Sequence, residues 1–422
     1  MIDLAKELYP INRSLSGDGV RKTLKILQRE NSELNIYEIK SGTQVFDWTV
    51  PKEWNCFEAY IITPDGKKIC DYSKNNLHIV QYSIPFKGEM DLEELGKHLY
   101  SYSKLPEAIP YVTSYYNEKW GFCISENDRK KLKKGKYRVV IKSELKDGVL
   151  NYGDIVIPGK TEKEIMFSTY ICHPSMVNNE LSGPVLATFL AKYIKNIDNY
   201  YTYRFVFAPE TIGSLIYMSD KLDKLKQNVK AGFILTCVGD EREYSYLASR
   251  YGNTLADKVA LNLLENEIKE FKRYSFLDRG SDERQYCAPG IDLPTCSVMR
   301  TKYGEYPEYH TNLDDFNVVT AKGLEDSYNV YIKIIEVLEN NFNYQVQVLG
   351  EPQLGKRGLY PTSCTPDTDY SLAFLYRNFL AYADGSNDLI DIANIIGVSA
   401  YRLVEIAKLF ETHQLIKRMK NV

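Results

Sequence analysis

Residues 169–184 read TYICHPSMVNNELSGP and join an expected strand to an expected helix. The apolar run at residues 164–171 is typical of a buried strand, and the apolar spacing of residues 184–197 is that of a helix. His173 therefore stands at the end of a strand, and Pro174 turns the chain after it. The polar residues that follow, including Asn178 and Glu180, make this corner suited to a metal ion.

Strands and helices alternate on both sides of this segment. Further strands are expected at residues 203–208, 231–238 and 293–299, and further helices at residues 212–222, 253–271 and 321–338. This order predicts an α/β fold with a mostly parallel sheet and helices on both faces. Ligands of such sheets bind beyond the carboxyl ends of the strands, so the loops there are where chemistry is expected.

Residues 47–127 differ in composition and residue pattern from the rest of the chain. They hold all three tryptophans, short alternating runs at residues 58–62 and 78–82 that indicate strands, and turn signals rich in Pro and Gly. We expect a β-rich domain inserted into an α/β domain that consists of residues 1–46 and 128–346. The run at residues 129–138, with seven basic residues in ten, is typical of a solvated turn before a strand, although it could also meet phosphate.

The C-terminal residues 347–422 are expected to form a winged-helix domain. Helices are predicted at residues 369–382, 389–396 and 400–411, and residues 392–407 have the helix–turn–helix pattern. From Glu351 onward, eight basic and eight acidic residues cancel. A DNA-binding domain normally has a basic surface, so this balance of charges argues against nucleic-acid binding and favours a structural or protein-contact role.

Composition bounds the class of protein. The 422 residues are 44% hydrophobic and 26% charged, with a net charge of −3, which excludes a disordered or collagen-like chain and gives no basic field for nucleic acid or membranes. The eight cysteines are scattered, and the sequence has neither a secretory signal nor an apolar run of about 18 residues. We therefore expect a cytoplasmic protein with free thiols and no membrane partner.

Four loops that follow strands carry groups able to bind a metal or move a proton. The first holds His173 and Glu180, the second Glu210, the third Asp282 and the fourth His310. Imidazole and carboxylate are zinc ligands, and a carboxylate beside a metal can act as a general base. The plainer interpretation is that Glu180, with Asn178, and Glu210 cap the helices that follow them.

The order of these motifs resembles that of the zinc-dependent aminopeptidases of the co-catalytic exopeptidase clan. The matching segments are HPS at 173–175, NNELSG at 178–183, ETIG at 210–213, SDE at 281–283 and HTNLD at 310–314. The whole chain resembles a bacterial branch that joins an aminopeptidase-like domain to a Trp-rich β domain and a winged helix and is often linked to polysaccharide biosynthesis. This closer match rests on DWTVPKEW at 47–54, YYNEKWGFC at 115–123 and CHPSM at 172–176.

The chain departs from that family at four positions. Where the family has carboxylates, this chain has the neutral residues Ser175, Asn179, Thr211 and Thr236. Neutral amides and hydroxyls bind divalent cations poorly, so the resemblance implies one zinc ion instead of two. The ligands expected from it are His173, His310 and Glu180, with a fourth place for water. Asp282 is the alternative third ligand or holds a substrate ammonium group, and Glu210 is the expected general base.

The resulting hypothesis is a cytoplasmic, one-zinc hydrolase of amide bonds, most simply an aminopeptidase-like peptidase acting on a peptide or a small amide. Candidate contacts for a substrate carboxylate or sugar are Arg250, Tyr251, Arg284 and Tyr286, which surface ion pairs explain almost as well. Two alternatives stay open: an amino-sugar deacylase, and a binding or regulatory protein that kept the fold and lost the chemistry. A homo-oligomer formed through the Trp- and Tyr-rich β surface is one further option.

Overall fold

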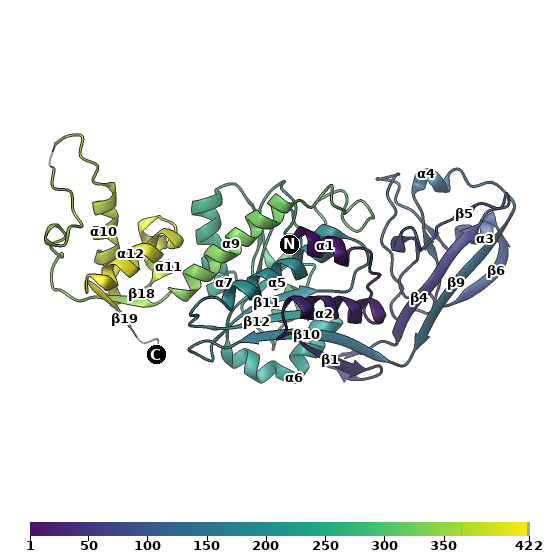
Figure 1. Cartoon of the computed structure of the whole chain (residues 1–422), viewed down its shortest axis with the longest axis horizontal. Helices are drawn as coiled ribbons and strands as arrows, with labels where there is room; N and C mark the ends of the chain where they lie inside the picture. Colours follow the sequence, from purple (N-terminus) through teal and green to yellow (C-terminus); the bar gives the residue numbers. More distant parts are fainter. Residues whose placement is uncertain (364, 420–422) are drawn as a thin grey trace. The chain divides into compact units, whose positions relative to one another are not determined.

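The computed structural model describes residues 1–363 and 365–419 (Figure 1). These residues divide into a larger unit, residues 1–252 and 272–328, and a smaller unit that comprises residues 253–271 and the chain from residue 329 onward. Among the described residues, no helix combines the length and apolar character that crossing a bilayer requires. Seven cysteines are free thiols, and Cys364 lies outside the described residues.

The larger unit is built on an eight-stranded sheet with the order β1-β10-β12-β11-β13-β16-β14-β15. Its strands are β1 Asn35–Lys40, β10 Val149–Ile157, β11 Glu164–Tyr170, β12 Thr202–Ala208, β13 Val229–Ile234, β14 Ser245–Leu247, β15 Lys272–Tyr274 and β16 Thr295–Met299. The four central strands, β12, β11, β13 and β16, are parallel, whereas β10 pairs antiparallel with both β1 and β12. At the other end of the sheet, β14 pairs antiparallel with β16 and parallel with β15. Every residue of β11 and β12 is buried, as expected for strands covered on both faces.

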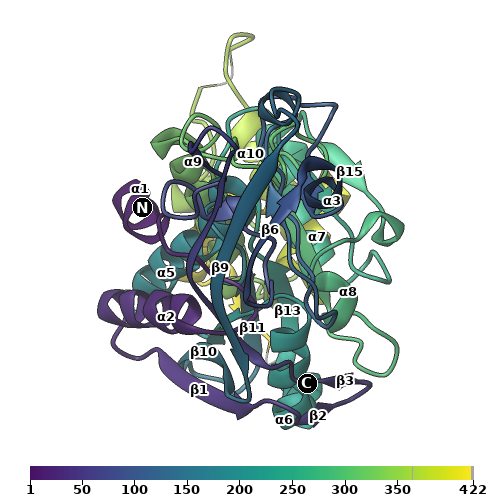
Figure 2. The same ribbon diagram turned by 90° about the vertical axis from the view of Figure 1, so that its right-hand side faces the viewer.

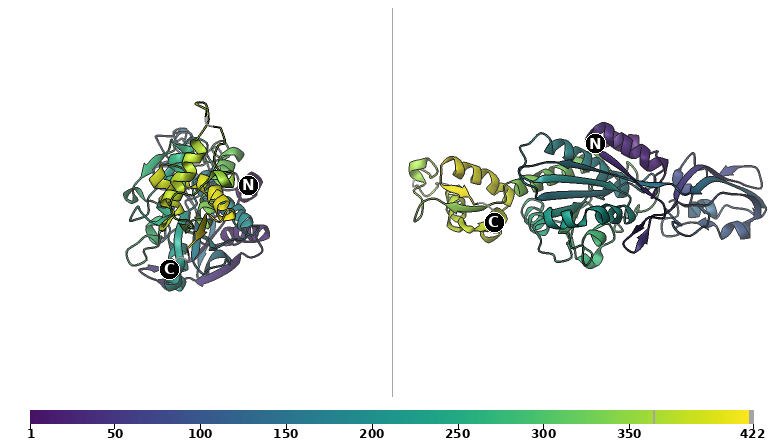
Figure 3. Two further views of the ribbon diagram at one scale, coloured as in Figure 1. Left: turned by 90° about the vertical axis from the view of Figure 1, so that its left-hand side faces the viewer. Right: turned by 90° about the horizontal axis from the view of Figure 1, so that it is seen from below.

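Helices cover both faces of this sheet (Figures 1 and 3). On one face lie α1 Ile2–Leu8, α2 Asp18–Glu30 and α5 Ser182–Ile194, and on the other lies α6 Ile212–Asn228. The amphipathic pattern of α2 explains its place, because Val20, Leu24 and Leu27 turn inward and are buried. The short helix α8 Glu283–Tyr286 and the 3₁₀ turn at Phe276–Asp278 follow β15, and α9 Ala321–Glu339 begins in this unit. The expected fold class is confirmed.

A second sheet in the larger unit has the order β5-β4-β9-β6 and is antiparallel throughout (Figure 2). Its strands are β4 Glu53–Ile62, β5 Lys68–Ile69, β6 Phe86–Asp91 and β9 Lys136–Lys146. Around it lie α3 Leu92–Gly96, α4 Glu126–Arg129 and two pairs of short strands: β2 Gln44–Val45 with β3 Trp48–Thr49, and β7 Leu99–Tyr100 with β8 Phe122–Cys123. Buried Trp54 and Trp120 belong to its core, and the Trp120 ring stacks on both Phe86 and His98.

The strand predicted at residues 78–82 is wrong. The chain instead forms a 3₁₀ turn at Asn76–His78, which the Asn75 side chain caps by accepting from the N–H of Leu77. Only isolated bridges follow, at Ile79 and Gln81, and Tyr82 has a φ of 65°, which no regular strand contains. The asparagine cap therefore outweighs the alternating pattern of this run.

The smaller unit contains the winged helix. Its elements are α7 Leu255–Leu263 with a π-helical turn at Leu264–Ile268, the C-terminal part of α9, β17 Asn343–Val346, a 3₁₀ turn at Gly355–Arg357, α10 Ser371–Tyr382, β18 Asp384–Asp388, α11 Leu389–Ile396, α12 Ala400–Thr412 and β19 Ile416–Arg418. Gly397 has a φ of 69° and ends α11 at the turn before α12. Asn262 of α7 bonds to Val398 O and to the N–H of Ala400, so α7 holds this turn.

Candidate functional site

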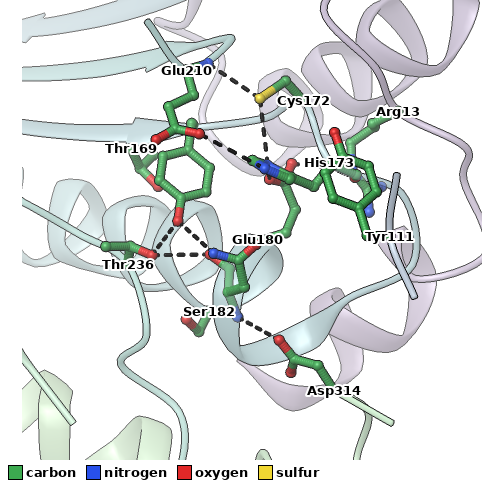
Figure 4. Close-up of polar contacts among 12 residues, drawn as sticks. Arg13, Tyr111, Thr169, Cys172, His173, Glu180, Ser182, Glu210, Thr236 and Asp314 are labelled. Carbon is green, nitrogen blue, oxygen red and sulfur yellow. Dashed lines mark hydrogen bonds and ion pairs between the residues drawn. The ribbon is translucent and has the colours of Figure 1, made fainter. Parts of the chain in front are cut away.

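The site is assembled where the parallel strands end, and its first component follows β11. His173 is buried, and its Nδ1 lies 2.9 Å from Oε2 of Glu180 (Figure 4). Burial alone lowers the pKa of His173, but the hydrogen bond to Glu180 and the charges of Glu180 and Glu210 outweigh burial and leave that pKa raised. A carboxylate at Nδ1 holds the proton there and leaves Nε2 as the nitrogen that can bind a metal.

Arg13 supports this pair from the N-terminal segment. The side chain is fully buried, its Nε donates to the His173 carbonyl oxygen at 3.0 Å, and the same Nε lies 3.4 Å from Oε1 of Glu180. Its Nη1 also donates to Leu8 O at 2.7 Å. The charge of Glu180 is thus compensated inside the protein by a residue more than 160 positions earlier in the chain.

Glu180 does not cap a helix. Residues Val177–Leu181 form a π-helical turn before α5, all five are buried, and neither this turn nor α5 has a side-chain cap. Asp314 fixes the turn, because its two carboxylate oxygens accept from the N–H groups of Asn178 and Asn179 at 2.6 and 2.9 Å. Burial raises the pKa of Asp314 to about 6. Turns of this kind are frequent at functional sites.

Glu210 follows β12 and is partly buried. Its Oε2 lies 3.7 Å from Nε2 of His173, and its Oε1 lies 3.9 Å from Nη2 of Arg284. Burial raises the pKa of Glu210, which strengthens it as a base. Its peptide N–H bonds to the sulfur of Cys172, and no side chain caps α6, so the carboxylate is not a helix cap.

The next residue, Thr211, has a strained backbone. Its φ of 65° and ψ of −78° form a γ-turn that is closed by a bond of 2.8 Å from the N–H of Ile212 to Glu210 O. Such a conformation is unusual for a β-branched residue. Asp282 accepts from the Thr211 N–H at 2.7 Å and from the Ser214 hydroxyl at 3.1 Å. Burial, and then the charge of Glu210, raise the pKa of Asp282 to about 7.

His310 completes the group from the loop after β16. Its ring centroid lies 5.4 Å from that of His173, and it stacks on Tyr309 at 3.9 Å. Its Nε2 is buried and has no hydrogen-bond partner among the described residues. Burial, followed by the charge of His173, lowers the pKa of His310 to about 3, so this imidazole is neutral and carries a free lone pair.

Tyr111 brings the β-rich part of the chain to the site. Its N–H bonds to His310 O at 2.7 Å, and its ring lies 5.2 Å from His173 and 5.1 Å from His310. An isolated bridge between Pro110 and Thr311 reinforces the contact. Neither Tyr111 nor Arg13 has a sequence signal that points to the site. Asp314 has one, because it ends the HTNLD segment.

In this chain, neutral side chains stand at positions where the zinc aminopeptidases have carboxylates. Three of these side chains bond to other groups. Thr236 lies 2.5 Å from the Tyr170 hydroxyl and donates to Asn179 O, while the Asn179 amide nitrogen donates to Tyr170 at 2.8 Å. Ser175 donates to Tyr9 O, away from the imidazoles. The Oδ1 atom of Asn179 stays buried without a partner among the described residues.

The candidate substrate contacts fall into two groups. Arg284 reaches the site, where it donates to the Thr211 hydroxyl at 2.5 Å. Arg250 pairs with Asp292 at 2.7 Å and with the hydroxyl of the exposed Tyr251. Tyr286 is buried, and its hydroxyl lies 2.8 Å from that of Ser168. The structure thus brings together five of the expected catalytic and metal residues, and Arg284 with them.

The donor chemistry fits a metal ion such as zinc. Ligand atoms of Cys172, His173 and Glu210 all lie within 4.8 Å of one another, and His310 adds a neutral imidazole with an unused nitrogen. Burial raises the pKa of the Cys172 thiol well above its usual value, so in the metal-free protein this thiol is protonated at neutral pH. Two imidazoles with nearby oxygen donors are a zinc environment.

Comparison with known proteins identifies the family of the chain. Residues 2–341 match a family model described as a domain of unknown function, DUF4910, and residues 342–418 match a winged helix-turn-helix model. A Clostridium acetobutylicum protein is 43% identical over 420 residues, which are 98% of this chain and 95% of that protein. Its provisional name is polysaccharide biosynthesis protein with aminopeptidase-like domain.

Solved structures share the fold. A Clostridium acetobutylicum protein, provisionally described as a peptidase, has a TM-score of 0.92 and 42% identity, over 99% of this chain and 95% of that chain. A zinc aminopeptidase from Bacillus subtilis has a TM-score of 0.54 and 12% identity, over 78% of this chain and 92% of that chain. A peptidase M28 precursor from Shewanella amazonensis has a TM-score of 0.55 and 12% identity, over 78% and 90%. The fold is therefore aminopeptidase-like.

Proposed function

The chain belongs to the DUF4910 family and has an aminopeptidase-like fold, and on that basis we propose that it is a hydrolase of amide bonds that uses one zinc ion. The observation that carries the proposal is the buried Nε2 of His310, a neutral nitrogen with no partner among the described residues, beside the His173 ring. An imidazole nitrogen loses its hydrogen bonds to water on burial, which is unfavourable unless the nitrogen gains a ligand.

We assign His173 and His310 as the two nitrogen ligands. The carboxylate nearest to His173 Nε2 is that of Glu210, at 3.7 Å. Glu180 then acts through His173 as a positioning residue, because its carboxylate lies at Nδ1 and a metal bound at Nε2 is on the other side of the ring. Asp282 faces the Thr211 N–H, which favours a supporting role over that of a ligand.

One zinc ion is favoured over two. The second ion of the related enzymes would need carboxylates where Thr211 and Thr236 stand, and both hydroxyls already bond to other side chains, those of Arg284 and Tyr170. Neutral oxygens do not compensate the charge of a second divalent ion.

Glu210 is the proposed general base. A bound zinc ion would polarise the amide carbonyl and make water more acidic. Glu210 accepts the proton of the attacking water and returns it to the leaving amine, and its raised pKa suits both steps. Arg284, 3.9 Å from Glu210, keeps part of the carboxylate charged and lies where a substrate carboxylate could be held.

Metal content tests the proposal directly. We expect about one zinc ion per chain in the purified protein, its loss in His310→Ala, and its retention in His413→Ala, a histidine of the smaller unit. Two ions per chain would contradict the ligand assignment. The absence of any metal would favour the binding or regulatory alternative.

The substrate class needs a separate experiment. Aminoacyl amides and N-acetylated amino sugars should be compared with wild-type protein and Glu210→Gln. Turnover of aminoacyl amides that depends on Glu210 supports a peptidase, whereas turnover of amino sugars supports the deacylase alternative, with which the polysaccharide-related name of the Clostridium relative agrees.

We place the protein in a reducing compartment such as the cytoplasm, since seven cysteines are free thiols.

A further inference from the structure

A cavity of about 480 Å³ lies in the β-rich part of the larger unit. Its walls come from the turn between β4 and β5, from the chain that leads to the 3₁₀ turn at Asn76–His78, and from α4 and the loop after it. It shares no lining residue with the strand-end site. Its volume is within the range of about 300–1,000 Å³ that is typical of pockets for small molecules.

The rim of the cavity is strongly basic. The lysines that line it are Lys67, Lys68, Lys74, Lys131, Lys133 and Lys134, and the acidic residues are Asp65, Asp71 and Asp128. Two of these lysines are neutralised, Lys68 by Asp71 at 3.0 Å and Lys131 by Asp128 at 2.8 Å. The other four have no carboxylate within ion-pair distance among the described residues. Like charges gathered around one concavity repel one another and attract an anion.

The interior of the cavity is different from its rim. Apolar and aromatic side chains line it, namely Ile69, Cys70, Ile124, Leu132 and Tyr137. His78 also lines it, and its Nδ1 lies 2.8 Å from Cys123 O. That bond requires the proton on Nδ1, which leaves Nε2 as a hydrogen-bond acceptor. Burial lowers the pKa of His78, so the ring stays neutral.

We propose that this cavity binds a phosphorylated small molecule with a ring body, of the nucleoside diphosphate class. The phosphates would lie at the lysine rim, and the ring would lie against the apolar interior with a hydrogen-bond donor toward His78. The proposal gives a role to the basic run at residues 129–138, for which amide hydrolysis has no use. It does not depend on the chemistry of the strand-end site.

Calorimetric titration of the full-length protein with ADP tests it, with adenosine as the uncharged comparison. The double variant Lys67→Ala/Lys133→Ala removes two unpaired rim lysines. The matched control is Lys87→Ala/Lys104→Ala, two exposed lysines of the same β-rich part that do not line the cavity. Circular dichroism of both variants confirms that they are folded.

We expect ADP to bind, with a Kd at least about tenfold weaker in the rim variant and unchanged in the control, since each lost contact to a charged phosphate is costly. Raising ionic strength from about 0.05 M to about 0.5 M should also weaken binding. The proposal is overturned by no binding of ADP at about 1 mM, by equal Kd values in the two double variants, or by adenosine binding as tightly as ADP.

Discussion

Glu180 Oε2 lies 2.9 Å from Nδ1 of His173, while Glu210 Oε2 lies 3.7 Å from Nε2 of the same ring. The imidazole is thus held between two carboxylates with different tasks. Glu180 is fully buried and paired with Arg13, and Glu210 is the more accessible of the two. This difference in environment is the basis for proposing that Glu180 orients His173 and that Glu210 transfers the proton.

Replacing Glu180 by glutamine should weaken zinc binding about 10–100-fold, because the amide carries no charge and can present the wrong group to Nδ1. The measurement is competition with a zinc chelator. Glu33→Gln, a change in an exposed carboxylate paired with Lys195, is the matched control. Unchanged zinc affinity in Glu180→Gln would show that this carboxylate does not position His173.

Arg13→Ala should destabilise the protein by about 3–5 kcal/mol, because it removes the buried cation beside Glu180 and leaves that carboxylate with only its hydrogen bond to His173. Urea unfolding followed by circular dichroism measures the effect. Arg29→Ala removes an exposed arginine that also pairs with glutamates, and its effect should be much smaller. The double variant Arg13→Ala/Glu180→Ala should lose less stability than the two single variants added together. Simple additivity would contradict the coupling.

Thr211→Gly should stabilise the protein by about 1 kcal/mol while lowering turnover. Glycine adopts a positive φ without strain, and the released strain exceeds its cost in chain entropy. Activity should fall because the more mobile turn no longer fixes Glu210, and because the hydroxyl that holds Arg284 is lost. Thr211→Ser retains the hydroxyl and should retain more activity. A variant that is both less stable and fully active would refute this account.

Stability should depend on pH through Asp282. Its folded pKa of about 7 is above the ordinary value, so the folded protein binds this proton more tightly than the unfolded chain does. The stabilisation is therefore complete below about pH 4 and is lost as the pH rises toward about 7. Asp282→Asn mimics the protonated carboxyl and should flatten this part of the curve. Urea unfolding of zinc-free protein from pH 4 to pH 7 measures it, and parallel curves for the two proteins would exclude Asp282 as the source.

The sequence predicts the meeting of His173, Glu210 and His310 because each follows a strand of one parallel sheet, whose carboxyl ends share an edge. It does not predict the direction of Glu180. That direction depends on the π-helical turn, which a helical repeat does not encode. The sequence does not predict the place of Arg13 either, since an arginine in a loop is usually exposed and only the folded chain brings it beside Glu180.

The rest of the chain likewise contains segments that the sequence predicts and segments that it does not. Long apolar runs such as β11 and β12 are predicted well because burial on both faces dominates their composition. The run at residues 78–82 misleads because a local cap and a positive φ at Tyr82 outweigh its alternation. Tyr111 is one of 34 tyrosines, and nothing local distinguishes it from the others.

The backbone bond between Tyr111 and His310 has a consequence for how this family can change over evolutionary time. The bond and the adjacent Pro110–Thr311 bridge tie two loops together across a gap of about 200 positions in the chain. An insertion in either loop would move a wall of the site, so the two loops should keep their lengths or alter them in concert. Relatives that exchange the β-rich segment wholesale should therefore carry matching changes around His310, and chimaeric genes without them should encode proteins with a displaced imidazole.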